Sequence, residues 1–362
     1  MNASLPTGRL LVGLTVVALL GGCASGASTT PRPASPNPAT SPSTAIATPS
    51  PAAAATAAPT RNVAFESANP VLTPGVLDVY APANAGPWPV VVMFPPPGDD
   101  ALALMPEADR VADLGFVVFV PSGGRSPIGG AAPTYAEILA GNSQAACAVA
   151  FARAHAAEYG GDPATMIVFG HSGGAQTAAM VAFARPELSA GCLGGTTLGA
   201  IDALVTWEGD WLMSVTHPRL ADKDGWLAAD PRIMDALTPW TYLAEHKDLK
   251  VVVLVSEDPS LSLESEYPGV LVDREVGDPW AADSLLAVRD PSGDLRRQLV
   301  KNGALADGTL TFVEAQQLLF SVLEAQGNPV TLDVMPDSSH AYLRGDGWNV
   351  FLAAFPKAAA KD

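Results

Sequence analysis

Cysteine is scarce in this chain of 362 residues, which holds only three: Cys23, Cys147 and Cys192. None of them stands in a His/Cys cluster with the spacing of a zinc site. The sequence therefore predicts no metal site, and the three cysteines need another explanation.

Positive charge is also in short supply. The chain has 20 Lys plus Arg against 37 Asp plus Glu. All of the acidic residues follow residue 60, whereas Arg9 and Arg32 precede it. The part after residue 60 is thus strongly acidic, which disfavours nucleic acid and anionic lipid surfaces as partners.

A long apolar segment is missing too. The run from Leu10 to Leu20 is shorter than the roughly 20 residues that span a bilayer, but it suits the apolar region of a secretory signal. It ends in Leu20-Gly21-Gly22-Cys23, which resembles the signal of a bacterial lipoprotein. An ordinary secretory signal is the alternative. The resemblance implies a signal peptide over 1–22 and a diacylglyceryl group on Cys23, hence an extracytoplasmic protein anchored to the cell membrane by lipid.

The segment that follows has little to bury. Residues 24–60 consist of Ala, Ser, Thr, Pro and Gly, apart from Arg32, Asn37 and Ile46. Such a tract cannot offset the entropy cost of ordering, so 23–60 is predicted to be a disordered stalk and 61–362 the folded domain.

The two remaining cysteines are predicted to form a disulfide. If Cys23 is acylated, Cys147 and Cys192 are left as a pair, and paired cysteines of exported proteins are usually bridged. Cys147 falls in the helix before a strand and Cys192 after the helix that follows that strand, which could bring them together.

The domain alternates apolar, β-branched runs with helical patterns. Strands are expected at 76–80, 89–94, 116–120, 166–169, 203–207, 251–255 and 330–335, and helices at 106–114, 142–159, 175–184, 312–326 and 348–355. This order predicts an α/β fold, a mostly parallel sheet with helices on both faces and a site at the carboxyl ends of the strands. An insertion or lid is predicted at about residues 258–306.

One motif indicates chemistry. Gly170-His171-Ser172-Gly173-Gly174 matches G-x-S-x-G between an expected strand and an expected helix. The sharp turn needs glycine two residues before and two residues after the serine, exposes the Ser172 hydroxyl and aims the Gly173 N–H at a developing oxyanion. A glycine-rich turn without activity is the alternative.

The base for this serine is expected to be His340. It follows the last expected strand, in Met335-Pro336-Asp337-Ser338-Ser339-His340, and so reaches the carboxyl edge of the sheet. The other four histidines are interpreted as structural, and the side chain of His171 is expected to pack beneath the turn.

Three stretches then resemble the esterase/lipase branch of the α/β hydrolases, which includes carboxylesterase-like and feruloyl-esterase-like enzymes. They are YGGDPATMIVFGHSGGAQTAAMVA, VLDVYAP with PVVVMFPP, and VTLDVMPDSSHAYL. The resemblance implies the α/β-hydrolase fold and hydrolysis of small-molecule carboxylic esters through an acyl-serine intermediate, with no cofactor.

The acid of the triad is left with three candidates. In the family the acid follows the strand represented here by 251–255, which points to Glu257 or Asp258. Asp307 is preferred, because in the family the acid precedes the next helix by a few residues. We therefore expect the Asp307 carboxylate within hydrogen-bond reach of His340 Nδ1.

The loop after the second expected strand departs from the family. Where His-Gly-Gly-Gly or similar is usual, the chain reads Phe94-Pro95-Pro96-Pro97-Gly98-Asp99. Proline has no N–H to donate. Gly98, or failing that Asp99, is the candidate for the second oxyanion donor.

Two alternatives to an esterase follow from the same residues. One is a peptidase of the same fold. The other, motivated by the prolines, is a surface-binding lipoprotein that keeps the fold with little or no activity. Substrate specificity and oligomeric state do not follow from the sequence.

Overall fold

The computed structural model describes residues 57–65, 75–96, 98–122, 134–184, 198–209, 246–258, 312–340 and 342–360, with residues 188, 192, 236, 239, 242, 243 and 297. The expected signal peptide, Cys23, the stalk as far as residue 56, the insertion after residue 258 and Asp307 lie outside these ranges. Across the part described, no helix has the length and apolar character needed to cross a membrane.

The described residues form an eight-stranded sheet with the order β1-β2-β4-β3-β5-β6-β7-β8. Its strands are β1 (Thr60–Phe65), β2 (Gly75–Tyr80), β3 (Trp88–Phe94), β4 (Val117–Pro121), β5 (Gly161–His171), β6 (Ala203–Trp207), β7 (Lys250–Asp258) and β8 (Val330–Ser339). Only the pairs β1/β2 and β2/β4 are antiparallel. The strands from β4 to β8 run parallel, so their carboxyl ends meet at one edge.

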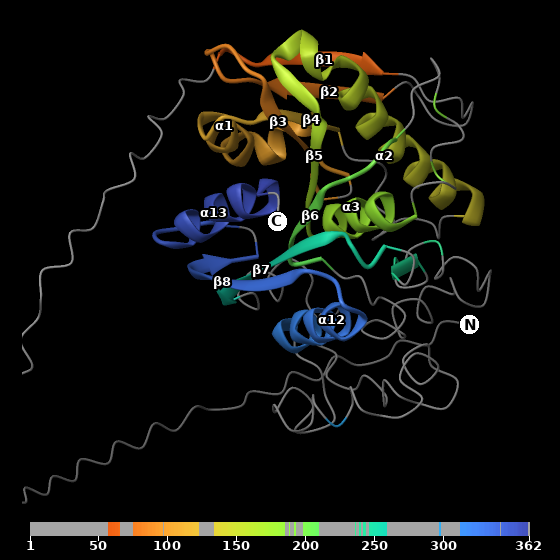
Figure 1. Ribbon diagram of the computed structural model, residues 1–362, viewed down its shortest axis with the longest axis vertical. Helices are drawn as coiled ribbons and strands as arrows, with labels where there is room; N and C mark the ends of the chain where they lie inside the picture. The colour runs from red at the N-terminus through yellow and green to blue at the C-terminus, as the bar shows by residue number, and fades with distance from the viewer. Residues whose placement is uncertain are drawn as a thin grey trace, which may run out of the picture. The chain divides into compact units, whose positions relative to one another are not determined.

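Helices cover both faces of this sheet (Figure 1). The helices are η1 (Ala101–Leu104), α1 (Met105–Asp113), α2 (Tyr135–His155), η2 (Ala156–Tyr159), α3 (Gly173–Phe183), α12 (Phe312–Gln326) and α13 (Gly347–Ala359). One apolar core lies between the sheet and α2, α3 and α12, and a second between the sheet and α1 and α13. The predicted α/β architecture is therefore confirmed.

Element boundaries differ from the prediction where polar residues take part. The edge strand β1 was not predicted, because it reads Thr-Arg-Asn-Val-Ala-Phe and is exposed along one side. Helix α2 starts at Tyr135 rather than at residue 142. Its start is set by a capping box, in which Thr134 Oγ1 accepts from the Glu137 N–H and the Glu137 carboxylate accepts from the Thr134 N–H.

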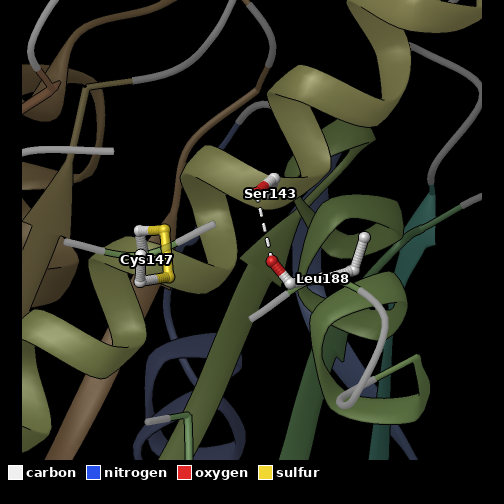
Figure 2. The surroundings of a disulfide bond; sticks show 4 residues. Ser143, Cys147 and Leu188 are labelled. Carbon is white, nitrogen blue, oxygen red and sulfur yellow. Dashed lines mark hydrogen bonds between the residues drawn. A yellow bond between two sulfur atoms is a disulfide. The ribbon is translucent and has the colours of Figure 1, made fainter. Parts of the chain in front are cut away.

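The predicted disulfide joins Cys147 of α2 to Cys192, with the two Cα atoms 5.1 Å apart. One turn earlier on α2, Ser143 Oγ donates a hydrogen bond to the Leu188 carbonyl, 3.0 Å away (Figure 2). The Arg153 guanidinium, near the end of α2, donates to the carbonyls of Leu198, Pro163 and Ala200. Helix α2 is thus fastened at three points to the chain on either side of α3.

Candidate active site

The turn between β5 and α3 has the geometry expected of a nucleophile elbow. Ser172 has φ 55° and ψ −127°, a conformation that few non-glycine residues adopt. A Cβ at Gly170 would lie 2.2 Å from the Gly174 carbonyl oxygen, so only glycine fits two residues before the serine. The strained turn places Ser172 at the carboxyl edge of the sheet, at the N-terminus of α3.

The proline-containing loop after β3 lies directly against this elbow. A Cβ on Gly174 would come within 2.2 Å of the Phe94 carbonyl oxygen and 2.3 Å of that of Pro95. Gly174 therefore permits a close approach of the loop to the first turn of α3. Further along, the Asp99 N–H donates to the Pro96 carbonyl at 3.2 Å, which leaves Gly98, exposed and at φ 93°, as the better candidate donor.

The next strand ends in the same way. The Ser172 N–H donates to the Trp207 carbonyl at 2.9 Å, and His171 is paired with Trp207 in the β5/β6 ladder. The residue after Trp207 is Glu208, whose φ of 51° also lies in the left-handed region. Two consecutive strands thus turn sharply side by side, one presenting a serine and the other a carboxylate.

Glu208 is bound through both of its carboxylate oxygens. Oε2 lies 2.5 Å from His340 Nδ1, and Oε1 accepts from the Ser256 N–H of β7 at 2.6 Å. The side chains of Glu208 and His340 are 0% and 7% exposed. Because the carboxylate can only accept, His340 Nδ1 carries the proton, which leaves Nε2 to act as an acceptor in the neutral ring.

His340 stands at the tip of a tight turn after β8. The Ser339 N–H donates to the Tyr342 carbonyl at 2.9 Å, and the Tyr342 N–H donates to the Ser339 carbonyl at 3.1 Å. The His340 carbonyl also accepts a hydrogen bond from His171 Nε2, 2.7 Å away. The imidazole is therefore held both by its ring nitrogen and by its backbone.

The carboxylate that meets His340 is not the one predicted from the sequence. Nδ1 of His340, where we expected the carboxylate of Asp307, binds Glu208, and Asp307 lies outside the described residues. Glu257 is exposed, and its carboxylate accepts from the Asp337 N–H at 2.9 Å. Asp258 ends β7 opposite Ser339, but its side chain is not among those described.

The physical reason is the register of the sheet. Glu208 follows β6, the immediate neighbour of the nucleophile strand, and the Ser256 N–H at the end of β7 faces its carboxylate. Trp207-Glu208-Gly209 after an apolar strand was a readable signal. The sequence prediction differs because the resemblance to the family places the acid after β7.

His171 packs beneath the turn, as expected. Its ring stacks on Trp207 with centroids 3.9 Å apart and lies 4.9 Å from the His340 ring. Burial, and then the nearby His340, lower the pKa of His171 well below its usual value. This histidine is accordingly neutral at neutral pH.

Among the described residues there is no cluster of His, Cys, Asp or Glu side chains that could hold a metal ion. The arrangement that is present joins a strained serine turn, a buried imidazole–carboxylate pair and a neighbouring loop with an exposed glycine, Gly98. Such a set can activate a hydroxyl and stabilise an oxyanion.

The comparisons with known proteins concern the fold. No protein-family model matches the chain, and no curated protein does. Among solved structures, it is similar to the propionate-bound esterase Est2 of the planctomycete Thermogutta terrifontis, with 16% identity over 82% of this chain and 92% of that one and a TM-score of 0.54.

Two further structures give the same result. A truncated carbohydrate esterase from gut microbiota is 14% identical over 86% of this chain and all of its own, with a TM-score of 0.56. The Thermogutta terrifontis esterase 2 phosphorylated by paraoxon is 16% identical over 81% of this chain and 92% of that one, with a TM-score of 0.51. At these identities the likeness shows the fold, which is that of the α/β hydrolases.

Proposed function

We propose that this protein is a serine hydrolase that cleaves carboxylic esters through an acyl-serine intermediate. The observation that carries the proposal is the pairing of His340 with Glu208 beside the strained turn at Ser172. The likeness to esterases in fold adds to it, without fixing the substrate.

In the proposed reaction the Ser172 oxygen attacks the ester carbonyl carbon while its proton passes to His340 Nε2. Glu208, already bonded to Nδ1–H, stabilises the imidazolium that forms. His340 then gives the proton to the departing alcohol as the carbon–oxygen bond breaks. A water, deprotonated by the same imidazole, hydrolyses the acyl-serine and regenerates the enzyme.

The oxyanion of each tetrahedral intermediate needs N–H donors. Gly173, the first residue of α3, is the proposed donor from the elbow, and Gly98 the proposed donor from the loop after β3. Pro95 and Pro96 cannot contribute. Loss of one such donor typically costs about 10²- to 10³-fold in rate, so the role of Gly98 decides how efficient the enzyme is.

A fluorophosphonate probe tests the central claim. We expect the probe to label Ser172, identified by peptide mass spectrometry, and p-nitrophenyl esters to be hydrolysed faster than matched peptide anilides. A folded protein that is not labelled would favour the surface-binding alternative suggested by the prolines. Faster cleavage of the anilides would favour a peptidase.

We also propose that the protein is extracytoplasmic and held at the cell membrane by lipid on Cys23. The disulfide supports an oxidising compartment. Cys23→Ser is expected to move the protein from the membrane fraction to the soluble fraction. Retention of this variant in membranes after signal cleavage would refute the anchor. The protein's partner in this proposal is the membrane itself, and its substrate a small-molecule ester.

A further inference from the structure

We infer that His171, the residue before the proposed nucleophile, is a positioning residue that fixes the backbone of His340 relative to Ser172. This inference rests on the serine hydrolase function proposed above. It adds a role for the variable position of G-x-S-x-G, whose side chain the sequence predicts to pack beneath the turn.

The contact joins strands that are not neighbours. His171 ends β5 and His340 follows β8, and in the sheet β6 and β7 lie between them. His171 Nε2 nevertheless donates a hydrogen bond to the His340 carbonyl, 2.7 Å away. It is a direct link between the nucleophile's own strand and the turn that carries the base.

In this hydrogen bond His171 must be the donor. A carbonyl oxygen accepts, so the proton sits on Nε2 of His171. The ring is held in place by stacking on Trp207 at 3.9 Å with planes 20° apart. Trp207 is itself fixed, because its indole N–H donates to Ser256 Oγ at 3.2 Å.

The same residue of β7 also holds the acid. Ser256 offers its side chain to Trp207 and its backbone N–H to Glu208. His340 is thus oriented twice: Glu208 sets the ring through Nδ1, and His171 sets the backbone through the carbonyl. Without the second bond Glu208 would still hold the ring, but the backbone of the turn at His340 would lose its link to the end of β5.

Three substitutions separate positioning from packing. His171→Phe keeps a ring on Trp207 and removes the donor. His171→Gln replaces the ring but places an amide N–H near the position of Nε2. Phe169→Leu, two residues earlier in the core of the same strand, is the matched control for lost packing.

The full-length protein is assayed for kcat and KM on one p-nitrophenyl ester, for the rate of fluorophosphonate labelling and for Tm. A misplacement of about 1 Å costs roughly 10²-fold, so His171→Phe is expected to lower kcat and the labelling rate by about that factor with little change in KM. His171→Gln should recover at least 10-fold of this loss. Phe169→Leu should lower Tm as much or more and leave kcat within a few-fold.

The two hypotheses fail differently. If the unmodified protein is folded but neither labels nor hydrolyses esters, the proposed function is wrong. If it does both and His171→Phe labels at the same rate, or if Gln is no better than Phe, His171 only packs and the inference is overturned.

Discussion

The carboxyl edge of β5 to β8 and the face covered by α2 use their side-chain contacts for different purposes. At the edge, Ser172 and Glu208 both have positive φ, and Glu208 is sealed from solvent with His340. On the α2 side, Arg153 and the disulfide fasten α2 to the segments around α3. The edge concentrates strain where chemistry is proposed, and the α2 face supplies stability that chemistry does not use.

The largest effect is expected from Ser172→Ala, which removes the proposed nucleophile. Ester hydrolysis should fall by about 10⁴-fold or more, and His340→Ala should cost nearly as much. Alanine keeps the Cβ and therefore the strained backbone at φ 55°, so Tm should change little. Near-normal hydrolysis by either folded variant would break the comparison, because the edge would then not be the active site.

The acid gives the next largest effect. Glu208→Gln keeps the shape but removes the charge that stabilises the imidazolium, so kcat should fall by about 10²- to 10⁴-fold. Glu257→Gln, on the adjacent strand end and exposed, is the matched control and should remain within a few-fold. If Glu257→Gln lowered kcat more than Glu208→Gln, the acid would instead be at the end of β7.

The α2 face should respond in stability alone. Replacing Cys147 and Cys192 together by serine releases a loop with a sequence separation of 45, worth at most about 4 kcal/mol in the free energy of unfolding. Urea denaturation of the variant and of the reduced wild type should give the same loss. The kcat of the folded variant should be unchanged. A loss of kcat as well as stability would show that the α2 face also affects the proposed active site.

The smallest effect concerns a buried carboxylate outside both regions. Burial raises the pKa of Glu107, in α1, to about 6, and its Oε2 has no hydrogen-bond partner within the described part of the chain. Because the folded pKa exceeds the ordinary glutamate value of 4.5, stability falls as pH rises from about 4.5 through 6.

Glu107→Gln should therefore stabilise the protein by up to about 2 kcal/mol at pH 8 and not at pH 4, measured by denaturant unfolding. Glu324→Gln, on an exposed carboxylate of α12, is the control and should show no such difference. Equal stability of Glu107→Gln and wild type at pH 8 would mean that this carboxylate has a partner the pKa shift does not reflect.

The sequence predicted elements best where one physical cause dominates. The apolar strand β6 and the periodic helix α12 have the predicted ends, 203–207 and 312–326. Strand β1 was missed because half of its residues face solvent and it adjoins a low-complexity tract. Thr134 and Glu137, three residues apart, indicate the early start of α2, whereas apolar spacing alone predicts a start at residue 142.

The candidate site divides in the same way. The elbow at Ser172 and the turn at His340 could be placed because each follows an apolar strand in a local pattern. The acid could not be placed by counting strands, since Glu208, Glu257 and Asp258 all lie at the carboxyl edge. Only the register among β6, β7 and β8 determines which carboxylate meets Nδ1.

The position of Glu208 bears on how this protein can diversify. With the acid on β6, the connection from β7 to α12, which runs from residue 259 to residue 311, contributes no member of the proposed triad. A change in that connection would therefore replace none of the three proposed catalytic side chains, which follow β5, β6 and β8. Selection for new substrates is then free to act on it while the chemistry stays in place, a separation that a catalytic acid at the end of β7 would not allow.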